Sequence, residues 1–398
     1  MNPVIGIDVA KGKSVATACL SLNEVFNKFS FEHTVSGLKR LQTVLDQVEQ
    51  AALCRPQIVL EATGSYSMPL YRYFKEQHYI YHVVNPYVSS RFNRWNLRKV
   101  KTDKIDSKAL CKLFYLERLY EKERRPYEYD ECKALSRACG SAVRTMVKQK
   151  VQFGVAVDRC FPGAQKLFSQ KCTNDLLTLL QIFPHPDTVT KLRACSVTVK
   201  IKAAFAHHHK AWCQEKALAL RELAQNCYPA VSLDSIQVHL LVETAQQLQE
   251  QVKKVETMKR ELVERMRSSP QFAAIASIPG FGENLAAAFL AETGDLRDFA
   301  THRQLIAFCG TEPSVYQSGS FTGTRQHLTK HGNSFLRAQL YMTVVGMANY
   351  KTNPVIRAYY EKKRLCEGKP YKVAVFACVN KLLRIIFAIS TREEQFSA

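Results

Sequence analysis

Residues 4–9 read Val-Ile-Gly-Ile-Asp-Val, and this stretch decides how the first part of the chain folds. Four of its side chains are apolar and β-branched, which predicts a buried strand. Asp8 lies among them, and a charge in an apolar strand is costly unless it is paired or bound to a metal. The stretch therefore predicts both the first strand of a sheet and the first residue of a candidate site.

Short strands and helices follow this strand in a regular order. Residues 36–52 have helical spacing, with Ser36 as the expected N-cap, and residues 58–61 form a buried type of strand that ends in Glu61. The first three short strands, with turn residues between them, are typical of a mixed sheet. The order of all the elements predicts an α/β domain over residues 1–125, with helices on a mainly parallel core. The expected strands are 4–9, 15–20, 25–31, 58–61 and 79–84, and the expected helices are 36–52, 66–77 and a segment at 101–106.

From about Pro126 the strand patterns stop. Residues 126–270 are expected to form a helical assembly domain with a local coiled coil, because apolar residues recur there every seven positions. Residues 271–398 are expected to form an α-rich C-terminal domain. The heptad positions are Leu241, Leu248, Val255 and Leu262, with Ala245, Val252 and Met266 at a companion position that Lys259 interrupts.

The composition excludes several classes of protein. With 46% hydrophobic residues, the chain is a folded rather than a disordered protein, and neither a membrane-spanning helix nor a signal peptide is expected. Lys and Arg number 56 against 35 Asp and Glu, and the resulting charge of +21 indicates a polyanionic partner, nucleic acid before membrane.

The 13 cysteines form no CxxC pair, which predicts reduced thiols in a cytoplasmic protein. His207-His208-His209 has no matched carboxylate or cysteine pair nearby and is interpreted as surface.

Four carboxylates are candidates for a metal site. Asp8 lies in one apolar strand and Glu61 ends another, while Asp103 and Asp106 share one face of an expected helix. They could converge at the carboxyl edge of the sheet, where α/β folds place ligands. Such hard oxygen ligands suit Mg²⁺, or Mn²⁺ in its place, and two ions could clamp both oxygens of a phosphodiester. Taken singly, each acid has a simpler interpretation as a local hydrogen-bond acceptor or a salt-bridge partner.

A basic segment immediately precedes the second acidic pair. Its cations could follow phosphates while Phe92 and Trp95 stack on bases, although a solvated amphipathic helix gives the same pattern. Its position beside the acids favours a nucleic-acid groove. The basic residues are Arg91, Arg94, Arg98, Lys99 and Lys101.

At these residues the chain resembles a known family, the DEDD transposases of the insertion-sequence-110 and pilin-gene-invertase group. The resemblance covers both ends of the chain and skips the middle. Each motif is short, but their order and spacing together are specific. The N-terminal motifs are GIDVAK at 6–11, EATG at 61–64, VNP at 84–86 and KTDKID at 101–106. The C-terminal motifs are IPGFG at 278–282, LIAFCG at 305–310, QSG at 317–319, LTKHGN at 328–333 and LRAQLYM at 336–342.

The resemblance implies a RuvC-like, ribonuclease-H-type N-terminal domain, a coiled-coil insertion used in assembly and a C-terminal transposase domain. It implies that the tetrad of Asp8, Glu61, Asp103 and Asp106 binds divalent metal, and that Ser318 is a nucleophile that becomes linked to DNA. The family's site is composite, with tetrad and serine brought together across protomers. Members also use a structured RNA, encoded in the element's non-coding end, to choose donor and target DNA by base pairing.

The C-terminal residues carry less chemistry when they are taken alone. Ser318 lies in a polar loop, where a serine needs activation by a base or a metal, and Ser320 and Tyr316 are close rivals. Residues 278–282 resemble a helix-hairpin-helix that could hold a phosphate, with a plain interhelical turn as the alternative. The basic, hydrogen-bonding residues Arg325, Lys330 and Arg337, together with His327 and His331, suit phosphate contacts.

Three functions compete. The leading one is a DNA recombinase or transposase that acts on donor and target DNA with a guide RNA, as a homo-oligomer that is a dimer or a tetramer, in the bacterial cytoplasm and at the nucleoid when bound to DNA. The second is a RuvC-like, metal-dependent, structure-specific nuclease that needs the tetrad but not Ser318. The third is a non-catalytic nucleic-acid scaffold, against which the four-acid pattern argues.

Overall fold

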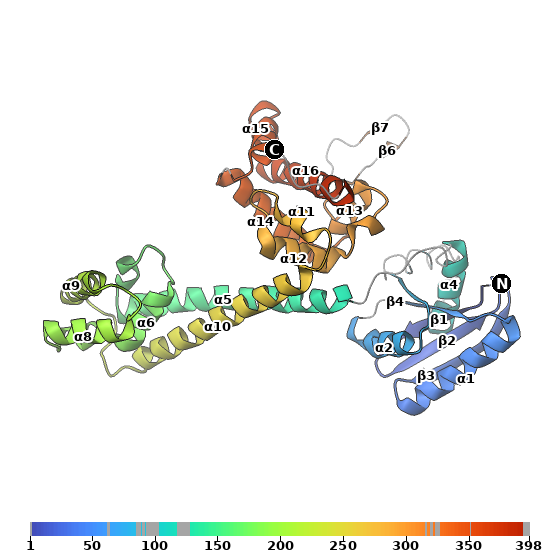
Figure 1. The fold of residues 1–398 in the computed structure, drawn as a ribbon, viewed down its shortest axis with the longest axis horizontal. Helices are drawn as coiled ribbons and strands as arrows, with labels where there is room; N and C mark the ends of the chain where they lie inside the picture. The colour runs from blue at the N-terminus through green and yellow to red at the C-terminus, as the bar shows by residue number, and fades with distance from the viewer. Residues whose placement is uncertain are drawn as a thin grey trace. The chain divides into compact units, whose positions relative to one another are not determined.

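The computed structural model describes residues 2–61, 64–84, 89, 92, 103–117, 128–314, 317–318, 321–322, 327–350 and 352–392. It separates into two compact units, Met1–Arg124 and Arg125–Ala398. The first unit holds a sheet, and the second is almost entirely helical (Figure 1). The sequence-based expectation of an α/β beginning and a helical remainder is therefore confirmed. The further division of the helical part at residue 270 stays a prediction.

The first unit is built on a five-stranded sheet with the order β3-β2-β1-β4-β5. The central strand β1 pairs antiparallel with β2 and parallel with β4. Strand β3 extends the antiparallel side, and β5 extends the parallel side. The strands are β1 (Val4–Val9), β2 (Lys13–Cys19), β3 (Val25–Glu32), β4 (Gln57–Glu61) and β5 (Tyr81–Val84).

Helices cover both faces of this sheet (Figure 1). Helices α1 (Val35–Ala52) and α2 (Met68–Glu76) pack on the face that carries Ile5 and Ile7, and α4 (Asp103–Leu116) packs on the other face. Because side chains alternate along a strand, Gly6 and Asp8 lie on the same face as Val4, which belongs to the cluster under α4. The alternation of side chains along β1 therefore places Asp8 on the face of the sheet that α4 covers.

Two sequence-based expectations for this unit are wrong. The sheet is not mainly parallel, because the connections at 10–12 and 20–24 are too short for a crossover and must make antiparallel pairs. The N-cap of α1 is Thr34 rather than Ser36, since the Gly37 backbone N–H donates to Thr34 Oγ1 at 3.1 Å.

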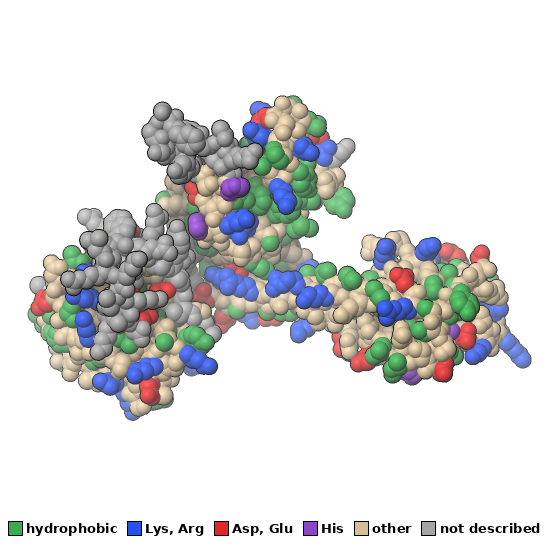
Figure 2. All heavy atoms as spheres, turned by 180° about the vertical axis from the view of Figure 1, so that it is seen from behind, with side chains coloured by type: hydrophobic (Ala, Val, Ile, Leu, Met, Phe, Trp, Pro, Cys, Tyr) green, Lys and Arg blue, Asp and Glu red, His purple; other side chains and the backbone are tan. Residues whose placement is uncertain are grey.

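The second unit begins with a long helical arm. Helices α5 (Glu128–Cys160) and α10 (Ile236–Met266) run antiparallel along it, and smaller helices close its end (Figure 1). Cys160 at the end of α5 donates to the Gln237 carbonyl at the start of α10, which fixes the antiparallel register. Figure 2 shows Lys and Arg side chains along one face of this helix pair. The closing helices are α6 (Asn174–Ile182), α7 (Pro186–Thr190), α8 (Ala194–Ala204) and α9 (Lys210–Asn226).

The predicted heptad positions of α10 are buried. Leu241, Leu248, Val255 and Leu262 are 0–4% exposed, and Lys259 is exposed as expected. Their packing partners come from α5, the closing helices and, at Leu262, the C-terminal core of the same chain. The apolar seam is therefore satisfied within the chain and gives no support for an oligomer.

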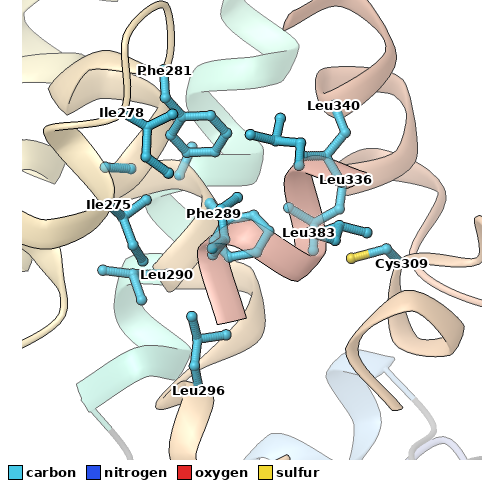
Figure 3. Packing of buried hydrophobic residues seen from close by; sticks show 14 of the residues in the cluster. Ile275, Ile278, Phe281, Phe289, Leu290, Leu296, Cys309, Leu336, Leu340 and Leu383 are labelled. Carbon is cyan, nitrogen blue, oxygen red and sulfur yellow. The ribbon is translucent and has the colours of Figure 1, made fainter. Parts of the chain in front are cut away.

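The C-terminal helices pack around a second apolar core (Figure 3). Phe281 and Phe289 meet edge to face at 5.9 Å, and Leu336, Leu340 and Leu383 complete the core around them. The turn at 278–282 lies against this core, with Ile278 and Phe281 buried. The elements are α11 (Phe272–Ala276), α12 (Gly282–Thr293), α13 (His302–Cys309), β6 (Gln317–Ser318), β7 (Phe321–Thr322), α14 (Ser334–Asn349), α15 (Pro354–Glu361) and α16 (Tyr371–Arg392).

Helix α16 is apolar and long enough to cross a membrane, and it is the one described helix with this property. Its apolar face belongs to the C-terminal core, where Val379, Leu382 and Ile386 are fully buried. The same helix carries Lys372, Lys381 and Arg384. Its composition is therefore explained by its place as a core helix.

Candidate metal centre and transposase region

Three of the four predicted acids line one pocket in the first unit. Asp8, Glu61 and Asp106 come from β1, β4 and α4, and Ser89 and Phe92 complete the polar and aromatic wall. The parallel register pairs Ile7 with Leu60, which places Asp8 and Glu61 at neighbouring positions of adjacent strands. The expected convergence of acids at the carboxyl end of β4 is therefore present for these three residues.

A close contact between β1 and α4 brings Asp106 to the pocket. A Cβ atom on Gly6 would lie 2.3 Å from the Ser107 carbonyl oxygen and 2.8 Å from Cys111 Sγ. Only a glycine leaves room for the helix at this distance. On the neighbouring strand, Thr17 Oγ1 and Ser107 Oγ form a buried hydrogen bond of 2.8 Å. Ser107 is thus fixed against the sheet, and Asp106 precedes it in the chain.

Cys111 provides a second attachment one turn further along α4. The Gly6 backbone N–H donates to Cys111 Sγ at 3.2 Å, and the same thiol donates to the Thr17 carbonyl at 3.2 Å. Hydrogen bonding to Cys19 and burial raise the pKa of the Cys111 thiol well above its usual value. The thiol is therefore kept protonated, which it must be to donate to Thr17.

Ser89 is a site residue that the sequence analysis missed. Its Oγ donates to Glu61 Oε2 at 2.9 Å, and Ser89 is 6% exposed. This hydrogen bond holds the carboxylate at the end of β4 in one orientation. Its sequence position, shortly after β5 and before the basic segment, gave no reason to connect it with Glu61.

Asp103 begins α4, and its side chain lies outside the described residues. It precedes Asp106 by three positions, so the two residues share one face of the helix. The predicted nucleic-acid contacts Arg91, Arg94, Arg98, Lys99 and Lys101 also lie outside the described residues. Their roles stay predictions.

Ser318 lies in a short antiparallel pair of strands in the second unit. Strand β6 pairs with β7 through Ser318 and Phe321, and only the backbone of Ser318 is described. Pro313 and Leu328 form an isolated antiparallel β-bridge between the two segments of the chain that flank this pair of strands. Ser318 therefore lies at the end of strand β6, whereas the sequence analysis placed it in a polar loop.

Two of the three predicted basic contacts near Ser318 are described. Lys330 is exposed and has a positive φ of 55°, in a turn that precedes α14. Arg337 is half-buried, and its Nη1 donates to the Gly310 carbonyl at 3.4 Å. Arg337 therefore has a packing role whether or not it contacts DNA, while Arg325 lies outside the described residues.

Two family models match the chain. One, described as a transposase model of the IS110 DEDD type, covers residues 5–162, and it includes all four predicted acids. The other, described as the Transposase IS116/IS110/IS902 family, covers residues 272–361, and it includes Ser318. The chain belongs to the DEDD transposase family. Residues 163–271, which include the closing helices and α10, are covered by neither model.

Individual relatives of this DEDD transposase support the assignment. The pilin gene-inverting protein of Moraxella bovis is 22% identical over 393 residues, which cover 98% of this chain and 97% of that protein. The insertion element IS900 uncharacterized 42 kDa protein of Mycobacterium paratuberculosis is 28% identical over 56% of this chain and 55% of its own length. The transposase for insertion sequence element IS1111A of Coxiella burnetii is 32% identical over 31% of this chain and 33% of its own length. The matches to the last two thus span about half or less of their length.

The donor set in the pocket fits the divalent metal that a DEDD domain implies. Carboxylates from three elements meet in one place, and hard oxygen ligands are those that Mg²⁺ and Mn²⁺ prefer. Metal ions would also offset the repulsion between these acids. The pocket of the DEDD transposase is therefore suited to hold such an ion.

A partly buried ion pair joins α5 to α12 in the transposase region. Glu292 of α12 is 1% exposed, and Arg137 of α5 donates to both its oxygens at 2.8 and 3.2 Å. Asn333 Nδ2 donates to Glu292 Oε2 at 2.6 Å, while Asn333 Oδ1 accepts from the first backbone N–H groups of α14. Glu292 therefore fixes the N-cap of α14, directly after the segment that carries the predicted phosphate contact Lys330.

Proposed function

We propose that this DEDD transposase is a metal-dependent DNA recombinase that cuts and rejoins DNA strands through a covalent phosphoserine intermediate. Its substrates are donor and target DNA. The observation that carries the proposal is the meeting of Asp8, Glu61 and Asp106 in one pocket. Asp103 joins them as the fourth acid on the same face of α4. We assign Mg²⁺ to this site, with Mn²⁺ as a substitute.

The chain's own residues supply the framework for this chemistry. Gly6 lets α4 approach β1, and Ser107 and Cys111 hold it there, so Asp106 is positioned beside the strand acids. Ser89 orients Glu61. Mg²⁺ held by these acids would polarise a phosphate oxygen and stabilise the charge that develops in the transition state.

Ser318 is the proposed nucleophile. Its Oγ forms a bond to phosphorus while the bond from phosphorus to the neighbouring nucleotide breaks. The serine gives up its proton, and the leaving oxygen takes the electron pair and a proton. The number of phosphoester bonds is unchanged, so the strand can be rejoined without ATP, in agreement with the lack of a Walker sequence motif in the chain.

The same proposal has three further parts. The first unit is RuvC-like, the protein acts as a homo-oligomer, and a guide RNA binds to it. The net charge of +21 supports a polyanionic partner, and the basic face of the α5–α10 pair offers one surface for it (Figure 2). Base pairing would select the DNA, so the protein would read the shape and backbone of the guide rather than its sequence.

A covalent-adduct assay tests the proposal. Purified full-length protein is incubated with Mg²⁺, RNA transcribed from the gene's flank, and labelled donor and target DNA. The products are separated on a denaturing gel. The variants are Ser318→Ala and Asp8→Asn, with Ser320→Ala as the matched control for a neighbouring hydroxyl. An adduct that persists in the control and is lost in both other variants is the expected result.

The alternative function gives a different gel. A structure-specific nuclease would release cleaved DNA without an adduct, would lose activity in Asp8→Asn and would keep it in Ser318→Ala. The acidic pocket lies within the first unit, which is what such a nuclease needs. Cleavage that survives Ser318→Ala at full rate would therefore replace the recombinase mechanism by hydrolysis.

A further inference from the structure

Two histidines and an aspartate meet at the closed end of the helical arm, far along the chain from the acidic pocket. Asp175 lies in the first turn of α6, and His207 and His208 lie in the connection between α8 and α9. Their ligand atoms all lie within 4.8 Å of one another. His208 Nε2 is 3.0 Å from Asp175 Oδ2, and His207 Nε2 is 3.7 Å from Asp175 Oδ1. We propose that these three residues bind Zn²⁺.

The geometry suits a tetrahedral ion. Zinc bonds to nitrogen and oxygen of about 2.0–2.1 Å place neighbouring ligand atoms about 3.3–3.5 Å apart. His208 Nε2 lies 3.0 Å from one oxygen of Asp175 and His207 Nε2 lies 3.7 Å from the other, and one ligand atom from each of the three residues lies within 4.8 Å of the other two. To bind one ion through a single carboxylate oxygen, the carboxylate and the His207 ring must rotate toward each other. Three protein ligands leave a fourth position for water.

These three ligands favour a different class of metal ion from the class that suits the acidic pocket. Two imidazoles and one carboxylate favour zinc and its late first-row neighbours, whereas Mg²⁺ prefers oxygen ligands alone. The overlooked partner was the carboxylate, because Asp175 precedes His207 by 32 residues and belongs to another helix. The interpretation of this tract as plain surface is therefore revised.

Neighbouring residues hold the ligands in place before any ion binds. The His208 ring stacks on Trp212, with centroids 3.8 Å apart and planes at 14°. Phe205 is 1% exposed and contacts the rings of both ligand histidines. His209 Nδ1 accepts from the Trp212 backbone N–H as the N-cap of α9, so this third histidine fixes the connection rather than ligating.

The site is accessible to an ion from solution. His207 has 62% of its side chain exposed, and His208 and Asp175 have 28% and 25%. A bound ion would tie the start of α6 to the connection between α8 and α9. Both histidines would bind as neutral imidazoles, so binding would release protons and weaken as the pH falls. The competing explanation is a metal-free cluster in which His208 Nε2 and Asp175 Oδ2 form a hydrogen bond of 3.0 Å.

Metal titration of the full-length protein separates these explanations. The chelator-treated, reduced protein is titrated with Zn²⁺ against a chromophoric chelator, in excess Mg²⁺ so that the acidic pocket is occupied. The variants are His207→Ala, His208→Ala and Asp175→Asn, with His239→Ala, an exposed histidine of α10, as the matched control. We expect one tight site in the parent and the control, and at least about a tenfold loss of affinity in each of the other variants. Equal affinity in the parent and His207→Ala would overturn the proposal.

Co²⁺ then distinguishes this site from the 13 cysteines. Nitrogen and oxygen ligands give Co²⁺ weak visible absorption bands, whereas thiolates add strong near-ultraviolet charge-transfer bands. The expected spectrum has the visible bands alone, and they disappear in His207→Ala, whose exposed side chain can be removed without disturbing the fold. A spectrum dominated by sulfur bands and unchanged in that variant would place the ion on cysteines and reject the proposal.

Discussion

Gly6 and Ser107 approach so closely that a methyl group on the glycine would lie 2.3 Å from the serine carbonyl oxygen. Gly6 belongs to the central strand, and Ser107 directly follows a predicted metal ligand. The distance between strand and helix is therefore also what determines where one acid stands relative to the other two. Replacing the glycine tests this relationship without touching any carboxylate.

Gly6→Ala should push α4 away from β1. We expect a loss of about 1–3 kcal/mol in the free energy of unfolding, from overpacking, and a loss of about tenfold or more in Mn²⁺ affinity because Asp106 moves. Chemical denaturation and Mn²⁺ titration measure the two effects. The control is Gly346→Ala in α14, where the added Cβ meets nothing within 4 Å and should leave the fold as stable or more so. Unchanged Mn²⁺ affinity in Gly6→Ala would contradict this account.

The three pocket acids should lower the stability of the metal-free protein and raise its stability when metal is bound. Without metal, Asp8→Asn, Glu61→Gln or Asp106→Asn should melt at the same temperature as the parent or higher, because each removes repulsion between carboxylates. With Mn²⁺ at about a hundred times its dissociation constant, the parent should gain about 2.7 kcal/mol and the variants much less. Thermal melts with and without chelator give both values.

The matched control for the acids is Glu24→Gln, which removes an exposed carboxylate from the turn between β2 and β3. It should respond to Mn²⁺ like the parent. If the variants of the pocket acids instead melted well below the parent without metal, these acids would be structural groups rather than ligands.

Ser89 should act as a positioning residue through Glu61. Ser89→Ala removes the hydroxyl that donates to Glu61 Oε2, so we expect Mn²⁺ affinity to fall about tenfold while the fold is retained. Ser67→Ala is the control, because Ser67 Oγ donates to the Gly64 carbonyl in the same unit but does not line the pocket. Equal losses in the two variants would point to a general effect of removing a buried hydroxyl.

Arg137→Met should destabilise the second unit by leaving Glu292 buried without its partner. We expect a loss of about 2–3 kcal/mol in the free energy of unfolding, below the roughly 3–5 kcal/mol of a fully buried pair because Arg137 is half exposed. Arg265→Met breaks only surface pairs with Glu261 and Glu131 and should change stability little. Similar losses in both variants would show that burial of Glu292 is not what matters.

The sequence predicted those parts of the site that depend on local patterns. Asp8 and Glu61 were found because an acid in or at the end of an apolar strand is unusual, and Asp106 was found through its spacing from Asp103. The contacts of Ser89 and Cys111 could not be predicted, because each joins residues 28 to 105 positions apart through one hydroxyl or thiol. At the end of the arm, the histidines were noticed but Asp175 was not, because it lies 32 positions before His207 in the chain.

The errors in the fold had visible causes. The two antiparallel strand pairs follow from the short connections at 10–12 and 20–24, which agree with the mixed sheet expected for these strands. The expectation of a mainly parallel core came from the alternation of strands and helices further along. The N-cap of α1 was placed two residues late because Thr34 and Ser36 are equally suitable by type, and only the Gly37 hydrogen bond distinguishes them. The seam of α10 was placed correctly, but its partner turned out to be α5 of the same chain.

Because α5 pairs with α10 along the whole arm, the length of the arm can change without altering the apolar cluster at either end. The chain leaves the C-terminal core along one helix and returns to it along the other, so each end of the pair has its own apolar cluster. Removing seven residues from each helix at matched heights would shorten the arm by about 10 Å and keep both clusters in register. Reach along the arm can therefore evolve, or be engineered, in steps of two helical turns without rebuilding either end.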